Sequence, residues 1–598
     1  MHTEENIMLK ILPEHPQQLL KAALGELACD IVFTNAKIVN VFTGEVLNGD
    51  VYVYEGFIAH VEYEHPGVID VPVNETIDCE GMYLIPGLID AHMHIESTML
   101  TPRNFAKAVL PKGTTTVVTD PHEIANVFGV PGVKYMHETS SDLPMRQLID
   151  IPSCVPSVPG KECTGAVFTA KDIETLSSLE RVVGLAEIMD FPGVIHGDQR
   201  MMSEIAAARA HGLYLQGHAP MVSGRMLSAY LCGGPETDHE SGSAAEALEK
   251  YRLGMHIDMR ESTMAKNVKE IWSGLKGSRY FDTLDVCTDD RESGDLLKYG
   301  HINDVLRIAI REGMNPIDAI KSATINNARE IHLDHLGAIA PGYAADLCVL
   351  PDLNAMNMYQ VYYGGKLVAK DDKLMVKIED RTDPIEEIDS MNIPDLTAED
   401  FVLKAPIQNG TVRVNVIDYP SLSSAYTKRV EMNLEVKDGK VLLPDENTKF
   451  AAIVNRFGLD HIALAVVRGV GNTTGALAST VSHDSHNLTI VYDTPEDALL
   501  CAETLKNCRG GLVTVKDGKV LAVLPLPIGG LLSKLDAEHT SELAEQVKEA
   551  DRKIGLTGIG NPLLRIATLA LPVCPELKMS DLGMIDSAAQ QFVPVFPD

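Results

Sequence analysis

Two histidines, His92 and His94, stand two residues apart at the end of the apolar run PGLIDAHMHIE. Side chains alternate between the two faces of a β-strand, so residues two apart point in the same direction. His92 and His94 therefore aim two imidazoles at one point, which suits a metal ion. Glu96 follows two residues after His94, where its carboxylate would be available for proton transfer. A metal site of this kind needs further ligands from other parts of the chain.

Short β-rich segments alternate with helical segments from Met82 onward. Eight candidate strands occupy residues 83–94, 114–120, 147–155, 181–189, 213–219, 237–240, 254–259 and 281–289. The sixth, which ends in TDHE, has the weakest strand pattern. Eight strands over roughly 210 residues predict an α/β fold of the (β/α)8 TIM-like barrel type. Two further helices are expected at 301–313 and 315–331.

Residues of metal-ligand type stand where several of these strands end. They are His92, His94, Glu187, His218, His239 and Asp289. The C-terminal ends of barrel strands form the catalytic face, so these side chains are expected to converge. A histidine taken singly is more often a packed core residue, but six donors at strand ends favour a metal centre. Nitrogen and oxygen donors without thiolate fit Mn, Fe or Zn, and a bridging carboxylate suits a pair of ions.

Short β-strands are also predicted on both sides of the barrel. Residues 31–62 alternate apolar and polar residues, which predicts antiparallel strands with turns at Thr43-Gly44, Asn48-Gly49 and Glu55-Gly56. An amphipathic helix is expected before them at 17–29, and β segments return at 337–353 and 356–371. A barrel inserted into a small, sandwich-like composite β domain would explain why matching segments flank it.

The last third of the chain predicts a separate α/β or α+β domain. The heptapeptide VKDGKVL occurs at 436–442 and again at 515–521, each time with Asp-Gly at the turn of an expected hairpin. Residues 495–507 have a helical pattern, and a charged linker is expected near 377–400. The predicted units are 1–83 (a helix and the first part of the composite β domain), 84–335 (the barrel), 336–380 (the second part of the β domain) and 381–598 (the C-terminal domain).

Composition limits the partners of the protein. The 598 residues carry a formal charge of −33, which repels phosphate backbones and anionic lipid, so neither nucleic acid nor membrane is expected as a partner. The ten cysteines include no CxxC pair and fit reduced thiols. The N-terminal region lacks a signal-peptide pattern, and no stretch reaches the ~18 apolar residues of a membrane helix. We expect a soluble cytoplasmic protein.

The motifs PGLIDAHMH and GAIAPGYAADLCVL, together with the later histidine and aspartate positions, resemble the amidohydrolase superfamily of metal-dependent barrel enzymes. The similarity covers about residues 30–380. The strings HIESTMLTP, DPHEIANV, GLAEIMDFPGV and TDHES, with the added C-terminal domain, are similar to the adenine deaminases within that superfamily. This resemblance implies hydrolysis of adenine to hypoxanthine and ammonia, in purine salvage or catabolism.

The resemblance also implies how the ligands divide between two divalent ions. One ion would be bound by His92 and His94 with contact from Asp289, and the other by His218 and His239, with Glu187 as the bridge. We expect Mn or Fe because carboxylates suit these ions, and Zn is the alternative.

Catalytic roles follow from the same resemblance. Asp289 is the expected general base and then general acid, which takes a proton from the attacking water and passes it to the leaving nitrogen. His239 would orient that water or polarise the purine. The proton for the ring nitrogen could come from Glu96, Glu123 or Glu240, and the sequence does not choose among them. Glu123 also has a structural interpretation, since it stands in a first helical turn, and Glu240 could instead orient His239.

Other polar residues near the predicted barrel mouth have two interpretations each. His122 would be an active-site residue or a packed side chain, and Arg260 and Glu261 would bind purine edges or form a solvated ion pair. His483 and His486 of the string SHDSHN would bind metal and cover the barrel mouth, or cap a turn before a strand. The glycine-rich VRGVGNTTGALAS lacks the lysine of a phosphate-binding loop, so no phosphate site is expected.

Two alternatives to adenine hydrolysis stay open from the sequence. A cyclic amidase or N-acyl amino acid deacetylase of the same superfamily would keep the barrel, although such relatives often carry lysine where this chain has Glu187. A non-catalytic structural relative would use the barrel for assembly, but such proteins typically lose ligands that are present here. The expected partner is a small-molecule substrate. A homo-oligomer is also expected, because large barrel enzymes often associate.

Overall fold

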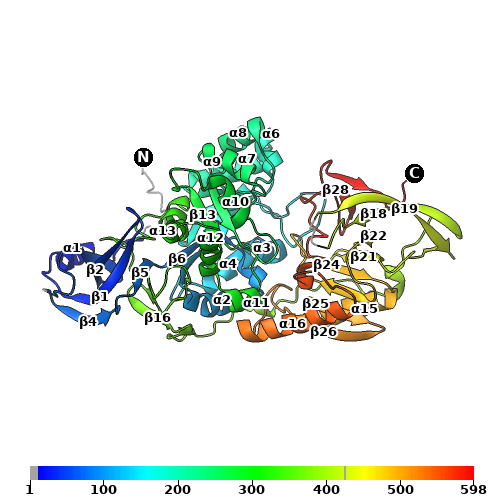
Figure 1. Cartoon of the computed structure of the whole chain (residues 1–598). Coiled ribbons are helices and arrows are strands. Elements are labelled where there is room, and N and C mark those ends of the chain that lie inside the picture. Colours follow the sequence, from blue (N-terminus) through cyan, green and yellow to red (C-terminus); the bar gives the residue numbers. More distant parts are fainter. Residues whose placement is uncertain (1–10, 70, 423–425, 598) are drawn as a thin grey trace.

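The computed structural model describes residues 11–69, 71–422 and 426–597. Two mixed sheets lie at opposite ends of the molecule, with parallel strands and most of the helices between them (Figure 1). The N-terminal strands lie at the left of this view and the C-terminal part at the right. None of the helices in these ranges combines the length and the apolar character needed to cross a membrane.

The first mixed sheet combines two distant parts of the chain. Its strands lie in the order β17-β16-β15-β14-β5-β1-β2-β3, and β4 pairs with β1. β14 pairs antiparallel with β5, so residues 347–374 complete the sheet begun by residues 29–86. The strands are β1 (Cys29–Asn40), β2 (Glu45–Tyr54), β3 (Phe57–Glu62), β4 (Val73–Asp78), β5 (Tyr83–Pro86), β14 (Leu347–Leu350), β15 (Gln360–Tyr363), β16 (Lys366–Lys370) and β17 (Lys373–Leu374).

Two expectations for the N-terminal part were wrong in detail. The helix α1 (Pro16–Ala23) ends well before residue 29, because Gly25 takes a left-handed φ of 72° and Cys29 already begins β1. Asn48-Gly49 lies inside β2 and is not a turn. A side chain at Gly49 would meet the backbone oxygen of Glu62 at 2.7 Å, so the glycine permits close strand packing. β1, β2 and β3 are antiparallel as expected.

Parallel strands form the centre of the structure. Within the described ranges, β6 (Leu88–Met93), β7 (Thr114–Thr119), β8 (Arg146–Ile151), β9 (Val182–Ile188) and β10 (Tyr214–Gly217) form one sheet, and β11 (Thr237–Asp238), β12 (His256–Arg260) and β13 (Leu284–Cys287) form another. Each predicted barrel segment therefore contains a parallel strand. The first segment is divided at Gly87, because β5 belongs to the mixed sheet. A Cβ on Gly87 would lie 2.3 Å from Thr115 Oγ1, so the chain passes too closely there for a side chain.

Helices connect the parallel strands. The helix expected at 301–313 is α12, whereas the helix expected at 315–331 is divided into α13, a π-helical turn over Ser322–Asn326, and α14. Apolar side chains of the strands and helices, such as Val117, Ile149 and Leu185, share one buried core. The helices are α2 (Pro102–Val109), α3 (His122–Phe128), α4 (Val130–Thr139), α5 (Ala170–Leu176), α6 (Phe191–His196), α7 (Gln199–Ala210), α8 (Gly224–Gly233), α9 (Ala244–Arg252), α10 (Val268–Leu275), α11 (Ser293–Tyr299), α12 (Ile302–Arg311), α13 (Pro316–Lys321) and α14 (Asn327–Glu330).

A second mixed sheet forms the C-terminal part, in the order β20-β19-β18-β22-β21-β24-β23-β25-β26. Both predicted hairpins are confirmed, with Lys437 opposite Lys440 and Lys516 opposite Lys519. The predicted helix at 495–507 is α15 (Pro495–Asn507), and α16 (Ala537–Lys553) also packs on this sheet. The strands are β18 (Gly410–Asp418), β19 (Lys428–Lys437), β20 (Lys440–Val441), β21 (Thr448–Val454), β22 (Ile462–Arg468), β23 (Ala476–Ser479), β24 (Leu488–Tyr492), β25 (Gly511–Lys516) and β26 (Lys519–Pro525), followed by the small antiparallel sheet β27 (Leu577–Ser580), β28 (Gly583–Asp586) and β29 (Gln591–Val593).

The charged segment 377–400 is packed against its surroundings and is not an exposed linker. Its apolar side chains Ile378, Ile385 and Ile393 are buried. The buried guanidinium of Arg103 in α2 donates a hydrogen bond to the backbone oxygen of Glu379. The segment therefore connects the parallel strands to the C-terminal sheet through fixed contacts.

The pKa of Glu204 predicts how stability depends on pH. Glu204 is fully buried on the face of α7 that also holds Met201 and Ile205. Burial raises its carboxyl pKa to about 8, against the opposing effect of Arg200. An acid with a raised folded-state pKa stabilises the fold fully below its unfolded pKa and loses this contribution as pH rises through the folded pKa. We therefore expect the melting temperature of the wild type to fall more steeply than that of Glu204→Gln between about pH 5 and pH 8.

Circular dichroism at a series of pH values would measure this difference. Glu174→Gln is the matched control, since Glu174 is exposed on α5 and its substitution should leave the wild-type profile unchanged. Parallel profiles for the wild type and Glu204→Gln would contradict the prediction.

Candidate metal centre

The predicted metal ligands converge at one end of the parallel strands. His94 Nε2 lies 3.2 Å from Asp289 Oδ1, and His92 Nε2 lies 3.6 Å from the same oxygen. Donor atoms at this spacing can bind one ion at about 2.0–2.2 Å. The two histidines lie at the end of β6 and the aspartate follows β13, so two strands far apart in the sequence supply this group.

Glu187, near the end of β9, contacts histidines on two sides. Its Oε1 lies 3.4 Å from His94 Nε2, and its Oε2 lies 2.6 Å from His218 Nδ1 and 3.2 Å from His239 Nε2. The two oxygens of one carboxylate therefore face different groups of imidazoles. A carboxylate that bridges two ions needs this arrangement.

Burial and protonation state fit metal binding. His92 is fully buried, and neither of its ring nitrogens has a hydrogen-bond partner among the described residues. Burial, assisted by the neighbouring His239, lowers the pKa of His92 to about 4, so its imidazole is neutral at pH 7. Burial opposes ionisation of Glu187, but His218 and His239 hold its pKa well below the usual range. Burial opposes the charge on His94 and His239, but nearby carboxylates outweigh it and raise their pKa, to about 9 for His239. Divalent ions bind neutral imidazoles, so ions held by these donors would displace the protons from the two rings.

Asp289 is turned toward the centre by its backbone. Its φ of 54° lies in the left-handed region, which aspartate tolerates better than most residues. Its N–H donates to the backbone oxygen of His92 at 3.1 Å, which joins the ends of β13 and β6. Burial opposes ionisation, but Arg260, His92 and His94 hold the pKa of Asp289 well below its usual range. The carboxylate is therefore ionised and available as a ligand.

Arg260 of β12 connects two carboxylates next to the centre. Its Nη1 donates to Asp289 Oδ2 at 2.5 Å and also to Glu240 Oε1. The Arg260 side chain is 8% exposed, so the solvated ion pair considered from the sequence is wrong for this residue. Burial opposes ionisation of Glu240, but Arg260 outweighs it and lowers the Glu240 pKa. Glu261 lies apart from this network and pairs with the exposed Lys266 at 3.5 Å.

The other predicted site residues lie beside the ligands. Glu96 is buried in a short 3-10 turn, and its Oε1 accepts a hydrogen bond from Ile124 N of α3 at 3.3 Å. Burial and the nearby Glu123 raise the pKa of Glu96 to about 7. His122 and Glu123 begin α3, and both are buried. His122 Nδ1 lies 3.7 Å from Glu187 Oε1, so His122 borders the centre.

Asp120 belongs to this site although the sequence analysis did not identify it. Its Oδ2 lies 2.9 Å from His122 Nδ1, and its backbone oxygen accepts a hydrogen bond from His94 Nδ1 at 3.0 Å. Both contacts orient an imidazole and leave its Nε2 available. Its position in the sequence, directly after β7 and before Pro121, could have indicated that Asp120 lies at a strand end.

His483 and His486 reach the same end of the strands from the C-terminal part. They stand between β23 and β24. His483 Nδ1 lies 2.7 Å from Glu123 Oε1, and His486 Nε2 contacts Glu123 Oε2. This position favours the interpretation in which the two histidines cover the end of the parallel strands over the one in which they only cap a turn.

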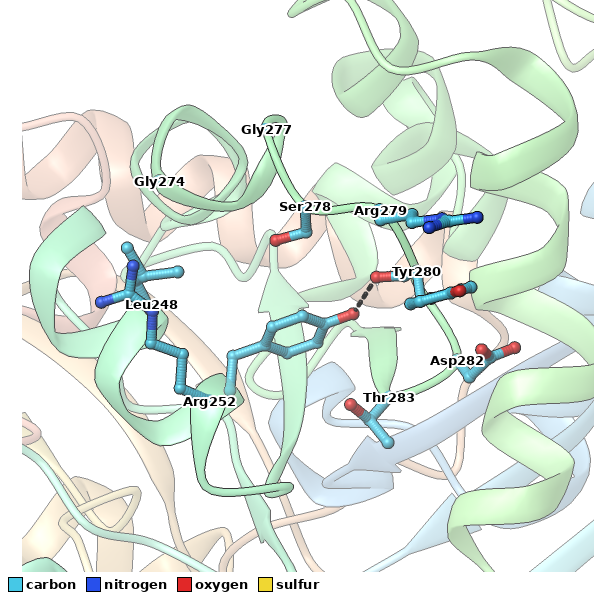
Figure 2. Close-up of a pocket in the computed structure, with 10 residues that line it drawn as sticks. Leu248, Arg252, Gly274, Gly277, Ser278, Arg279, Tyr280, Asp282 and Thr283 are labelled. Carbon is cyan, nitrogen blue, oxygen red and sulfur yellow. Dashed lines mark hydrogen bonds between the residues drawn. The ribbon is translucent and has the colours of Figure 1, made fainter.

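A separate surface pocket lies away from these residues. Its volume is about 610 Å³, and Figure 2 shows its lining residues on α9, α10 and the loop before β13. The hydroxyl of Tyr251 donates to the backbone oxygen of Tyr280 at 2.6 Å across it. The predicted metal ligands are not among the residues that line this pocket in the described part of the chain. The pocket is therefore distinct from the metal centre.

A comparison with known protein families agrees with the α/β fold of the central part of the chain. The model of the amidohydrolase family matches residues 83–368, which include every predicted metal ligand. This match identifies residues 83–368 as an amidohydrolase domain, and that family implies a divalent metal. The solved beta-aspartyl dipeptidase of Fervidobacterium islandicum AW-1 is 17% identical, covers 59% of this chain and 100% of that chain, and has a TM-score of 0.45.

Comparisons of the whole chain with curated relatives identify a narrower family. The model of the adenine deaminase C-terminal domain matches residues 424–591. Adenine deaminase 2 of Carboxydothermus hydrogenoformans is 38% identical over 97% of this chain and 99% of its own length. The adenine deaminase of Desulfatibacillum aliphaticivorans is 39% identical over the same shares of the two chains. The chain belongs to the adenine deaminase family.

The buried Arg260 network predicts a large effect on stability. Arg260→Met would leave the buried Asp289 and the half-buried Glu240 without the cation that they share. Removing one partner of a buried ion pair typically destabilises a protein by about 3–5 kcal/mol. We expect Arg260→Met to lower the thermal unfolding midpoint strongly, and the double variant Arg260→Met/Glu240→Gln to recover part of the loss.

Differential scanning fluorimetry would measure these midpoints on the same preparations. Arg279→Met is the control, because Arg279 is exposed and its substitution should change the free energy of unfolding by less than about 0.5 kcal/mol. Equal midpoints for Arg260→Met and Arg279→Met would show that the network does not stabilise the fold.

Proposed function

We propose that this protein hydrolyses adenine to hypoxanthine and ammonia, as an enzyme of purine salvage or catabolism. The observation that carries the proposal is full-length similarity, at 38–39% identity, to proteins named adenine deaminase. The geometry agrees, because buried imidazoles surround an ionised carboxylate at the end of the parallel strands. Glu187 stands where many related amidases carry lysine, which argues against the cyclic amidase alternative.

We propose further that the two parallel sheets close into one (β/α)8 barrel. Contacts at both seams support closure. At one seam, Glu236 N donates to the backbone oxygen of Leu215, which joins the segment before β11 to β10. At the other seam, Met93 of β6 forms a parallel bridge with Asp289. The first mixed sheet would then be the composite β domain, formed by residues 1–83 and 336–380, and residues 381–598 the C-terminal domain.

Two divalent ions, Mn or Fe in preference to Zn, are the proposed cofactors. His92, His94 and Asp289 would hold one ion, His218 and His239 the other, and Glu187 would bridge them. When bound, two such ions lower the pKa of a water molecule and so supply a nucleophile at neutral pH. The ten free cysteines fit a reducing compartment, so we also propose a cytoplasmic protein that forms a homo-oligomer.

Asp289 is the proposed proton carrier of the reaction. Its carboxylate is ionised, and Arg260 holds Oδ2 while Oδ1 faces the histidines. Asp289 would accept a proton from the attacking water and return it to the amino group, which leaves as ammonia. A C–O bond forms at C6 of adenine and the C–N bond breaks, so adenine and water give hypoxanthine and ammonia. His239, next to Glu187, would orient the water.

The ring nitrogen must also gain a proton during the reaction. We propose Glu96 for this step, because its pKa of about 7 keeps part of its carboxyl groups protonated at neutral pH. Glu240 is a poorer donor because Arg260 favours its ionised form. Burial disfavours the charge on Glu123, but His483 and His486 outweigh burial and lower its pKa, so Glu123 is also ionised.

The manganese-loaded protein should remove the adenine absorbance band as hypoxanthine forms. Adenine, adenosine and simple cyclic amides should be assayed side by side, and only adenine is expected to react at a high rate. Glu187→Gln should lose the metal pair and at least about a thousandfold in turnover, because activation of water depends on the bridge. Full activity of Glu187→Gln with both ions bound, or preference for a cyclic amide, would contradict the proposal.

Asp289→Asn separates proton transfer from metal binding. The amide keeps the size of the side chain and one oxygen, so much of the metal should stay bound. Loss of general acid–base catalysis should lower kcat about 100-fold or more. Metal content and kcat would be measured on the same preparation, with Asp282→Asn, on the exposed side of the surface pocket, as the control. A kcat near that of the wild type would exclude Asp289 as the proton carrier.

A further inference from the structure

We propose that the protein has a third cation site, formed by His122, Glu123, His483 and Asp484 and separate from the Glu187 centre. The first two residues begin α3, directly after β7. The other two stand between β23 and β24 of the C-terminal sheet. A cation here would join the barrel mouth to the C-terminal part. This inference goes beyond the proposed reaction, because it does not depend on the substrate.

The spacing of the donor atoms fits one enclosed ion. Glu123 Oε1 lies 3.6 Å from His122 Nε2 and 2.7 Å from His483 Nδ1. Asp484 Oδ1 lies 3.8 Å from His122 Nε2 and 3.9 Å from His483 Nδ1. Donors bound at about 2.0–2.2 Å to a tetrahedral ion lie about 3.3–3.6 Å from one another. The donor atoms of His122, Glu123 and His483 all lie within 4.8 Å of one another and can share one ion, and Asp484 Oδ1 lies beside two of them.

Neighbouring groups orient the donors toward this point. His122 Nδ1 pairs with Asp120 Oδ2 at 2.9 Å, which leaves His122 Nε2 to face the proposed ion. This carboxylate–imidazole pair is the usual support of a metal-binding histidine. His486 Nδ1 accepts a hydrogen bond from Ser482 N at 3.2 Å, so the ring hydrogen is on Nε2. Nε2 then donates to Glu123 Oε2 and leaves Oε1 free to act as a ligand.

Burial of these polar atoms is energetically unfavourable unless a ligand contacts them. Glu123 is 2% exposed and Asp484 is 3% exposed. Within the described residues, neither Glu123 Oε1 nor Asp484 Oδ2 has a hydrogen-bond partner, although His483 Nδ1 lies close to Glu123 Oε1. Leaving a buried carboxylate oxygen without a hydrogen bond is energetically unfavourable, and more so when the carboxylate is charged. A cation bound to Glu123 Oε1 would remove this cost for Glu123.

The donor set indicates the class of ion and its role. Two imidazoles and two carboxylates without thiolate suit Zn²⁺, Mn²⁺ or Fe²⁺. Four protein ligands leave no open position on a tetrahedral ion, which is typical of a structural site. His122 borders both centres, since its Nδ1 lies 3.7 Å from Glu187 Oε1 while its Nε2 faces Glu123 and Asp484. The third ion would thus fix α3 beside the metal pair without taking part in the reaction.

Metal content per chain tests this proposal directly. The full-length wild type, His483→Gln and Asp484→Asn would be produced in zinc-supplemented medium, desalted and analysed by inductively coupled plasma mass spectrometry. We expect three equivalents in the wild type and two in each variant. His539→Gln is the matched control, because the His539 side chain is 66% exposed on α16 and its loss should leave three equivalents.

Asp484→Asn keeps the size of the side chain, so it serves as the test if His483→Gln does not fold by circular dichroism. Two equivalents in the wild type would overturn the proposal, as would three equivalents in a folded Asp484→Asn protein. Loss of all metal from that folded variant would also overturn it, because the third site would not then be separate. A chain with three ions that does not act on adenine would refute the proposed reaction and leave the third site standing.

Discussion

The buried carboxylate of Glu187, shared between histidines on two sides, is the interaction on which the rest of the centre depends. An ionised carboxylate inside an apolar core is unfavourable unless opposite charge compensates it. The imidazole of His92 is neutral and supplies no such charge, although its nitrogens are available as ligands. The nearby His218 and His239 favour the ionised form of Glu187, and bound divalent ions would take over this role. The donors and their burial are therefore consistent with metal binding, which requires these distant strand ends to lie close together.

The need to compensate carboxylate charge also explains the contacts made by the residues near Glu187. One guanidinium, that of Arg260, contacts both Asp289 and Glu240 and so compensates two carboxylates. Glu123 and Asp484 lie at the same mouth, where His122, His483 and His486 are the basic groups in contact with them. Imidazoles can carry a positive charge, or stay neutral and share a cation. His486 donates a hydrogen bond to Glu123 Oε2, whereas Glu123 Oε1 forms no aligned hydrogen bond with His122 or His483. The contacts of His122 and His483 therefore favour the second arrangement, since a simple ion pair would be expected to form aligned hydrogen bonds.

Most residues of this centre could be predicted from the sequence, because the position of a parallel-strand end in the fold is known in advance. Each parallel strand places its last residues at one face, so residues such as His94 and Glu187 could be assigned from local pattern alone. Local signals also predicted α15 and the Asp-Gly hairpins. The division of the first barrel segment at Gly87 was missed, because the apolar pattern continues through it and only the close approach of Thr115 reveals it. Asp120 was missed for a related reason, since its role depends on contacts with two imidazoles that only the fold shows.

The contact between α3 and the C-terminal sheet had no signal in the local sequence. Glu123 and His486 are 363 residues apart in the chain, and no periodicity connects residues at that distance. The entropy lost on closing a loop grows only slowly with its length, so a few strong contacts can hold such distant parts together. The Glu123 carboxylate is buried against partners from the C-terminal part, so this contact fixes α3 relative to the C-terminal sheet. The position of His122, in the same helix turn, thus depends on a part of the chain that supplies none of the predicted ligands of the Glu187 centre.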